Sequence, residues 1–291
     1  MQFSLRGRLT AIAILLALTI ACPATLPVGS QSKEALAFAV IGDSGTGQAP
    51  QYEVARRMKA YRERVRFDFV LMLGDNIYPH GEAALFTPRF EEPYKDLLKD
   101  GVKFYASLGN HDLERGTDAA LHYDKFNMDG HRYYSFTKAH GLIEFFALDS
   151  SAMTAQQLAW LEGALKESKA RWKVAFFPHP LYCSARKHGS DVELRAQLEP
   201  LFVRYKVDAV FAGHDHVYER MKPQKGIYYF TEGASGQLRK GNINRRSEMF
   251  EAGNDTVNSF LIVEVDAAQM KVEAVGSNGA ILDQVVINKS R

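Results

Sequence analysis

The amino-acid sequence predicts an α/β fold in which two packed sheets carry helices on their outer faces. Near-continuous apolar runs that end in Gly or Pro are typical of strands buried on both faces. Amphipathic helical segments alternate with these runs, and short alternating strands follow toward the C-terminus. The chain has 291 residues, 46% of them hydrophobic, without an internal repeat or a long linker, which favours a single domain over residues 36–291.

The first 35 residues predict export rather than structure. Arg6 and Arg8 precede the apolar run Thr10–Ala21, which is too short to span a bilayer comfortably. A basic segment followed by a short apolar one is typical of a secretory signal, so we expect a signal peptide over residues 1–24. Residues 25–35 then form a tether.

Two ways of processing this segment stay open. Ordinary cleavage after Ala24 is one, and the lipidation of Cys22 as in a bacterial lipoprotein is the other. Thr19 stands where the lipidation motif prefers Leu, and an uncleaved anchor is the remaining alternative. We expect an exported protein, periplasmic or secreted, that reaches a membrane only through a lipid on Cys22.

From residue 36 onward, five apolar runs predict buried strands, and each ends in a polar motif. In chain order they are ALAFAVIGDSG, FDFVLMLGDNIY, VKFYASLGNHD, WKVAFFPHP and VDAVFAGHDH. Four later runs alternate apolar and polar residues between turn residues, and they predict an antiparallel meander. These are GIYYFTEG, SFLIVEVDA, QMKVEAVG and AILDQVVI.

Three segments predict helices. The stretch PQYEVARRMKAYRERV places basic residues on one face and, on the other, Val54, Met58, Tyr61 and Val65. TAQQLAWLEGALKES opens with Thr154 and Gln157 at capping-box spacing. Residues 191–206 form the third candidate, which Pro200 is expected to kink or split.

Every one of the five strand ends delivers a side chain that can bind a metal ion. Functional groups collect beyond the carboxyl ends of strands in α/β sheets, because the loops there share one edge. A turn that merely contains histidine would explain one such motif but not five in the same pattern. The candidates are Asp43, Asp75 with Tyr78, Asn110 with His111, His179, and His214 with His216.

The residue types indicate a hydrolytic metal site. Carboxylate, phenolate, amide and imidazole without thiolate suit iron, manganese or zinc, and they do not suit a structural zinc finger. Even seven ligands from this set are too many for one ion. Two ions that share a bridging carboxylate would use them well, and paired ions are a recognised solution for phosphoester hydrolysis.

The motifs GDSG, GDNIY, GNHD, HP and GHDH, in that order, resemble those of the calcineurin-like metallophosphoesterases. More narrowly, they resemble the small purple acid phosphatases of the tartrate-resistant type, and the likeness covers residues 36–291. The resemblance implies a four-layer α/β/β/α sandwich, in which two mixed sheets are flanked by helices. It also implies a phosphatase.

One position separates the subfamilies. Many metallophosphoesterases have a metal-binding histidine in the first motif, where this chain has Gly45, and this chain offers Tyr78 instead. A phenol with an ordinary pKa of about 10 binds near neutral pH mainly to a strongly Lewis-acidic ion, which favours Fe(III). The alternative is that Tyr78 only packs in a loop.

The resemblance implies a role for each candidate. One set would hold Fe(III), namely Asp43, Asp75, Tyr78 and His216. Asp75 would bridge to a divalent ion (Fe, Zn or Mn), held also by Asn110, His179 and His214. His111 would bind substrate and protonate the leaving group, and His188 would line the substrate pocket unless it is a solvated loop residue. Asp112 and Asp215 are expected to orient imidazoles from behind the ligands.

The expected reaction is direct hydrolysis of a phosphomonoester. Two metal ions would clamp a phosphoryl oxygen, a metal-activated hydroxide would attack phosphorus in line, and His111 would help the alcohol leave. A phosphodiesterase or nucleotidase on the same metals is one alternative. A non-catalytic phosphate-binding module is another, which the complete ligand set argues against.

The charge balance bears on the partners. A net charge of +2 argues against a nucleic-acid binder, which would need a clear basic excess. We therefore expect a small phosphorylated substrate, no nucleic acid, and a monomer.

Overall fold

The fold is built from two mixed sheets, seen in a computed structural model that describes residues 1–2 and 35–289. The signal segment, the tether and the lipid site expected up to residue 35 lie outside the described residues, apart from Met1, Gln2 and Ala35. Residues 35–289 form one compact unit. No helix in the described ranges has both the length and the apolar character needed to cross a bilayer.

The first sheet has six strands, and their spatial order is β13 (Ile281–Asn288), β12 (Gln269–Gly276), β11 (Ser259–Val265), β1 (Leu36–Ile41), β2 (Phe69–Met72) and β3 (Lys103–Ala106). The second has seven, ordered β10 (Phe250–Asn254), β8 (Tyr218–Met221), β9 (Tyr228–Glu232), β7 (Ala209–Ala212), β6 (Trp172–Phe177), β5 (Ile143–Ala147) and β4 (Tyr134–Lys138). Strands β1, β2 and β3 are mutually parallel, as are β5, β6, β7 and β9.

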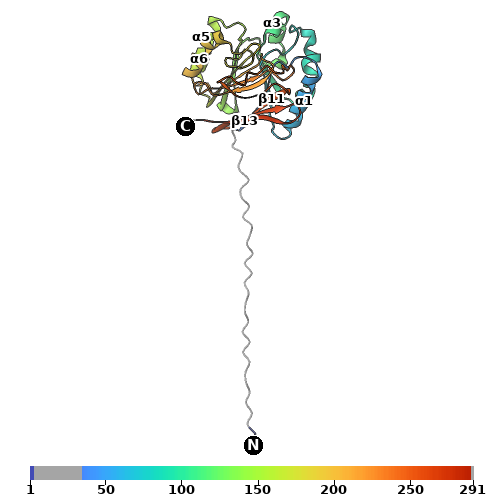
Figure 1. Ribbon diagram of the computed structural model, residues 1–291, viewed down its shortest axis with the longest axis vertical. Coiled ribbons are helices and arrows are strands. Elements are labelled where there is room, and N and C mark those ends of the chain that lie inside the picture. The colour runs from blue at the N-terminus through green and yellow to red at the C-terminus, as the bar shows by residue number, and fades with distance from the viewer. Residues whose placement is uncertain (3–34, 290–291) are drawn as a thin grey trace. The chain divides into compact units, whose positions relative to one another are not determined.

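The helices lie outside the two sheets. Figure 1 shows α1 on one side of the strands and α5 and α6 on the other. The α-helices are α1 (Ala49–Arg62), α2 (Lys95–Lys99), α3 (Asn110–Arg115), α4 (Thr117–Leu121), α5 (Ala155–Glu167) and α6 (Val192–Arg204). Short 3-10 or π turns complete the set, namely η1 (Ala83–Leu85), η2 (Thr87–Glu91), η3 (Asp124–Phe126) and η4 (Ala139–Gly141).

Alternate residues of the central strands enter different cores, which establishes the four layers. In β1, Phe38 and Val40 pack between the sheets, whereas Ala39 and Ile41 face the core beneath α1. In β6 the same alternation divides the side chains between the inter-sheet core and the core beneath α5 and α6. Each sheet therefore has one face against the other sheet and one face against helices, which confirms the predicted α/β/β/α sandwich. Burial on both faces explains why these strands are apolar at nearly every position.

The three predicted helices are present, with one correction. Thr154 caps α5 by accepting a hydrogen bond from the Gln157 amide at 3.1 Å. The expected split at Pro200 is wrong, because α6 runs through it as one helix. Leu198 and Phe202 are fully buried on either side of Pro200, so packing holds the helix together across the missing N–H donor.

The C-terminal meander is confirmed for β11, β12 and β13, which pair antiparallel in sequence order. It is wrong for GIYYFTEG. That segment is β9, which runs parallel to β7 and antiparallel to β8. Its carboxyl end, after Glu232, therefore lies at the same edge of the sheet as the carboxyl end of β7.

Candidate metal centre

The candidate ligands follow the carboxyl ends of strands in both sheets. Asp43, Asp75 and Asn110 follow β1, β2 and β3, while His179 and His214 follow β6 and β7. The two sheets are joined at this edge because the His214 amide donates to Asp43 Oδ2 at 2.7 Å. The strand-end pattern of the sequence thus places residues 171 positions apart in direct contact.

Three candidate ligands adopt a backbone conformation that L-residues rarely use. Asp43, Asp75 and His214 have φ angles of 51°, 50° and 70°. Left-handed backbone at a non-glycine residue costs of order 1–3 kcal/mol and persists where the surrounding structure requires it. Here each strained residue turns its chain sharply at the strand end, where such strain is typical of functional sites.

Two glycines allow the loops to approach one another. A Cβ atom on Gly45 would lie 1.9 Å from the Asn76 carbonyl oxygen, so no histidine fits at that position in this structure. Gly45 instead accepts a hydrogen bond from the Tyr78 amide at 2.9 Å, which brings the tyrosine into the cluster. A Cβ on Gly109 would lie 2.1 Å from Asp75 Oδ1. The close packing of the loops therefore requires glycine at position 45, where many metallophosphoesterases have histidine, and the same loop contact positions Tyr78.

Tyr78 lies at the centre of the oxygen-rich half of the site. Its hydroxyl is 3.0 Å from Asp75 Oδ2, 3.2 Å from Asp43 Oδ1 and 3.4 Å from His216 Nε2. His216 Nε2 is in turn 3.4 Å from Asp43 Oδ1. The four residues implied as Fe(III) ligands therefore lie together, and the Tyr78 hydroxyl is within 3.4 Å of a side-chain atom of each of the other three.

The electrostatics of this cluster call for a cation. Asp43 and Asp75 are buried, and no Lys or Arg among the described residues lies within 4.0 Å of either carboxylate. Burial, followed by the charges of Asp43 and Asp112, raises the pKa of Asp75 well above its usual range. Burial and the two carboxylates likewise raise the pKa of the Tyr78 phenol. Buried carboxylates are normally paired or bound to metal, and a cation between them would reverse both pKa shifts.

The nitrogen-rich half of the site contains His179 and His214, whose ring centroids are 4.5 Å apart. Burial lowers the pKa of His179, and burial followed by the neighbouring His179 lowers the pKa of His214 to about 4. Both rings are therefore neutral near pH 7, as metal ligands must be. Ser150 Oγ lies 2.8 Å from His179 Nδ1 and fixes that ring, which leaves Nε2 free.

Asn110 supplies the oxygen of its side-chain amide. Its Oδ1 is buried and has no hydrogen-bond partner within the part of the chain described. The residue begins α3, and the next amide, that of His111, donates to Asp75 Oδ1 at 3.1 Å. A buried acceptor without a donor is rare, and it fits an oxygen that binds a cation.

The two remaining histidines both lie beside the candidate ligands. The ring centroid of His111 is 4.7 Å from that of Tyr78, and its Nδ1 lies 2.7 Å from the Pro79 carbonyl oxygen. The exposed His188 has its ring 4.3 Å from that of His214. A cavity of about 330 Å³ opens here, and its lining includes His179, His188, His214 and Lys187.

Asp112 and Asp215 are buried behind the ligands, but they hold backbone rather than imidazole rings. Asp112 accepts hydrogen bonds from the amides of Asn76, Ile77 and Gly109, at 2.9–3.1 Å. Asp215 accepts from the Gly189 amide at 2.9 Å. The expected imidazole contact is therefore corrected: each carboxylate anchors a loop that carries candidate ligands or His188.

The donor set divides cleanly between the sheets. All oxygen donors come from the first sheet, namely Asp43, Asp75, Tyr78 and Asn110, and all nitrogen donors from the second, namely His179, His214 and His216. No three His, Cys, Asp or Glu side chains of residues 1–2 and 35–289 form a metal cage by themselves. The candidate set also contains the Tyr78 phenol and the Asn110 amide oxygen, which are further donor types that metal ions accept.

Sequence reasoning missed two strand ends. The end of β5 provides Ser150, and the signal FFALDSS was overlooked because serine is not a metal ligand. The end of β9 provides Ser235, which exchanges hydrogen bonds with Gly42 at 3.2 and 3.3 Å. Farther along that loop, Arg239 donates its amide to the His216 carbonyl at 2.9 Å, and its Nη1 is buried without a partner among the described residues.

Comparisons with known proteins agree with this arrangement. Residues 36–218 match the profile of the calcineurin-like phosphoesterase family. The chain is 29% identical to purple acid phosphatase 17 of Arabidopsis thaliana over 246 residues, covering 74% of this chain and 72% of that one. It is 26% identical to human tartrate-resistant acid phosphatase type 5 over 291 residues, covering 85% and 89% of the two chains.

A solved structure shares the fold at low sequence identity. GAP50, the anchor in the inner membrane complex of Plasmodium, superposes with a TM-score of 0.79 over 88% of this chain and 90% of its own, at 20% identity. That likeness concerns the fold alone. The ligand set, rather than the fold, therefore has to carry any argument about chemistry.

Proposed function

The chain belongs to the calcineurin-like phosphoesterase family, and from this premise we propose that it is an exported, purple acid phosphatase-like enzyme that hydrolyses phosphomonoesters at two metal ions. It is a hydrolase that acts on phosphoric ester bonds, as its acid phosphatase relatives are. The observation that supports the metal site best is the cluster of the buried Asp43, Asp75 and Tyr78 with the half-buried His216, which lacks any lysine or arginine partner among the described residues.

The residues that would hold the ions fall into two groups. Fe(III) would be held by Asp43, Asp75, Tyr78 and His216. A divalent ion of iron, zinc or manganese would share Asp75 and be held by Asn110, His179 and His214. When bound, two such ions supply Lewis acidity toward phosphoryl oxygens and lower the pKa of water.

His111 is suited to protonate the leaving alcohol. Its Nδ1 lies 2.7 Å from the Pro79 carbonyl oxygen, which can only accept a hydrogen bond, so Nδ1 carries a proton. Nε2 is then the atom that gains and releases the catalytic proton. The His111 amide donates to Asp75, and this contact fixes the residue relative to the cluster.

His188 is suited to bind the substrate phosphate. It is exposed, its ring lies tilted beside that of His214, and it lines the small cavity together with Lys187. A cavity of about 330 Å³ is at the lower end of the range for small-molecule sites, which supports a small phosphorylated substrate.

Export is proposed from the sequence before residue 25. Arg6 and Arg8 followed by Thr10–Ala21 support a periplasmic or secreted protein, with a lipid on Cys22 as the form that would remain at a membrane. Mass spectrometry of protein purified from the exporting cell tests this. A new N-terminus near Thr25 indicates ordinary cleavage, a diacylglyceryl adduct on Cys22 indicates a lipoprotein, and an intact Met1 contradicts both.

Metal analysis combined with turnover of p-nitrophenyl phosphate tests the function. We expect two ions per chain, and a loss of turnover of at least about a hundredfold in His111→Ala. His122→Ala is the matched control, because His122 is exposed and belongs to no candidate site. Binding of phosphate without turnover by the metal-loaded protein would contradict the enzyme assignment and favour a binding module. Faster turnover of bis(p-nitrophenyl) phosphate would indicate a diesterase.

A further inference from the structure

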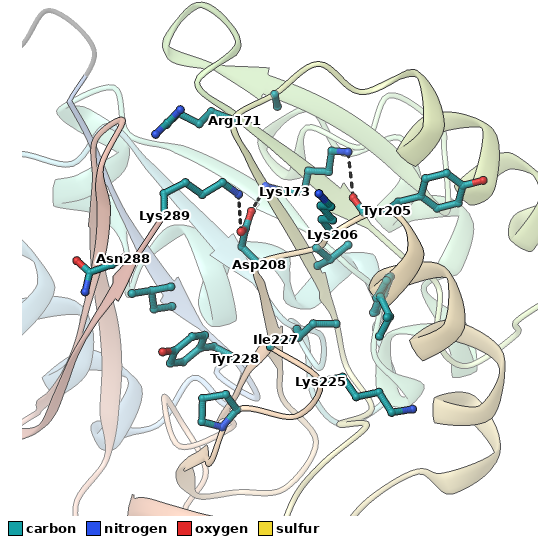
Figure 2. Close-up of a pocket in the computed structure, with 17 residues that line it drawn as sticks. Arg171, Lys173, Tyr205, Lys206, Asp208, Lys225, Ile227, Tyr228, Asn288 and Lys289 are labelled. Atoms are coloured by element: carbon teal, nitrogen blue, oxygen red, sulfur yellow. Dashed lines mark hydrogen bonds and ion pairs between the residues drawn. The ribbon is translucent and has the colours of Figure 1, made fainter. Parts of the chain in front are cut away.

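A second cavity, of about 640 Å³, lies at the opposite ends of the strands that carry the histidine ligands. It borders Lys173 near the start of β6 and Asp208 just before β7, whereas His179 and His214 follow the other ends of these strands. Figure 2 shows Arg171 and Lys289 along one side of the cavity and Lys225 across from them. We call it the basic cavity.

The lining of the basic cavity is strongly cationic. Five basic side chains line it, namely Arg171, Lys173, Lys206, Lys225 and Lys289. Asp208 is its one carboxylate, so the lining has a formal charge of +4. The whole chain carries only +2, which means that this hollow gathers far more positive charge than the average of the surface.

Two of the lysines have structural partners that account for them. Lys173 Nζ lies 3.3 Å from the Leu165 carbonyl and 3.1 Å from the Tyr205 carbonyl, at the C-terminal ends of α5 and α6. Lys289 Nζ lies 2.5 Å from Asp208 and 4.7 Å from the centre of the Trp172 ring. The negative ends of the two helices and the one carboxylate are thereby already matched.

Other cations in the cavity keep donors to spare. Lys206 is exposed and makes no side-chain hydrogen bond or ion pair within residues 35–289. Arg171 is also exposed and donates only Nε, to the Ala267 carbonyl, so its two terminal nitrogens have no partner in the same range. Lys225 is held by Glu199 at 2.5 Å and contributes less. Helix capping therefore does not explain the surplus.

A guanidinium edge and an ammonium around one hollow suit a phosphate group. Arginine offers two parallel N–H donors to an anion, and lysine adds a point charge. Asn288 and Tyr228 add neutral donors to the lining. The volume of about 640 Å³ lies within the range of small-molecule sites, so a phosphate with an attached organic group also fits.

We propose that the basic cavity is an anion site, separate from the metal centre, that binds a phosphate group. The phosphate has two possible sources, a soluble phosphorylated molecule or an anionic lipid headgroup. A lipid headgroup is considered because β1, into which the expected tether leads, begins near the cavity. Leu36 at the start of β1 pairs with Val265, and the Ala267 carbonyl two residues later accepts a hydrogen bond from Arg171.

Trp172 provides a reporter for this site. The chain has two tryptophans, so Trp160→Phe leaves Trp172 as the single one, under the Lys289 ammonium. We expect inorganic phosphate, titrated at constant ionic strength, to shift the Trp172 emission in a saturable way. The pair Arg171→Gln and Lys206→Gln should weaken binding by at least about fivefold, and the affinity should fall as salt is added.

Matched controls separate the basic cavity from general charge and from the metal centre. Arg66→Gln with Lys95→Gln removes the same charge at exposed positions elsewhere and should leave the affinity unchanged. His214→Ala in the same background should keep the Trp172 response, and the cavity variants should keep wild-type turnover. If Trp160→Phe does not fold, phosphate binding to the basic cavity can be measured instead by calorimetric titration of His214→Ala, which needs no fluorescent reporter.

Vesicles of phosphatidylcholine, with and without phosphatidylglycerol, distinguish the two sources. Sedimentation with the anionic vesicles alone, lost in the cavity variants, would assign the site to a headgroup. Phosphate binding without sedimentation would assign it to a soluble ligand. The proposal is overturned if phosphate causes no saturable change, or if the cavity variants bind it as tightly as the control.

Discussion

Tyr78 owes its importance to the side chains around it. The Asp43 and Asp75 carboxylates lie within 3.2 Å of its hydroxyl, and together they hold the phenol protonated as long as no cation joins them. A trivalent ion at the same point would favour the phenolate instead, because it stabilises the charge that the carboxylates oppose. If Fe(III) binds here as proposed, charge transfer from the phenolate to the iron would absorb visible light, so this one residue would couple metal identity to colour.

Replacing Tyr78 with Phe tests this coupling. The variant should lose the visible absorption band of the metal-loaded protein and at least about tenfold of its turnover, because one ligand of the ferric ion is gone. Tyr52→Phe, which removes an exposed hydroxyl far from the cluster, is the control. A band that survives in Tyr78→Phe, or a colourless wild-type protein that contains only zinc or manganese, would refute the ferric assignment.

Sequence reasoning could not identify Ser150 as part of the site, because Ser150 contacts the candidate ligands only through His179. Its hydroxyl is 2.8 Å from His179 Nδ1, so Ser150→Ala should leave the ring free to turn. We expect the affinity for the divalent ion to fall by about tenfold to a hundredfold, as for other residues that orient ligands. Metal titration monitored by turnover measures this. Exposed Ser151→Ala should match the wild type.

Among the elements, α5 shows how a correct local pattern can serve a different purpose. Thr154 caps the helix as predicted, but the Gln157 side chain does not return to the cap. Gln157 is buried and hydrogen-bonds the backbone of Asp149 at 2.8 and 3.0 Å, next to Ser150. The helix start therefore braces the strand end that orients His179.

The cap itself can be tested by stability. Thr154→Ala should lower the free energy of unfolding by about 1 kcal/mol, because the Gln157 amide loses its acceptor. Thr154→Ser keeps the oxygen and should restore most of the loss. Urea unfolding of the three proteins measures the difference. Equal stability of the Ala and Ser variants would show that the cap contributes nothing.

Local patterns predicted the elements that local chemistry decides. An apolar run followed by Gly or Pro and a candidate ligand locates β1, β2, β3, β6 and β7, because neighbouring residues in the sequence determine both the strand and the turn after it. The continuity of α6 through Pro200 could not be predicted, because it depends on the burial of Leu198 and Phe202 against other elements. The parallel pairing of β9 with β7 depends on a distant partner in the same way.

At the scale of the whole molecule, Glu232 lies at the junction of the two sheets. It ends β9, is fully buried, and accepts hydrogen bonds from Ser259 of β11 at 2.9 and 3.1 Å. Burial raises its pKa from 4.5 to about 8. The folded protein therefore binds a proton that the unfolded chain has released between these two pH values.

This proton makes the stability of the fold depend on pH. The contribution of Glu232 is complete below pH 4.5 and is lost as the pH rises through about 8. Relative to Glu232→Gln, which mimics the protonated acid, the wild type should lose roughly 1.4 kcal/mol per pH unit between these limits. Urea unfolding at several pH values measures this. A flat difference would show that Glu232 is ionised in the folded protein.

The separation of donor types between the layers has a consequence for how the protein matures. A folding intermediate in which only one sheet has formed would place either the oxygen ligands or the imidazoles in position. Neither set alone would provide the ligands that two ions need. Catalytic competence should therefore appear last during refolding, after the layers have docked. Bound ions would cross-link the two sheets, so removing them with a chelator should weaken the contact between the sheets before it affects either sheet.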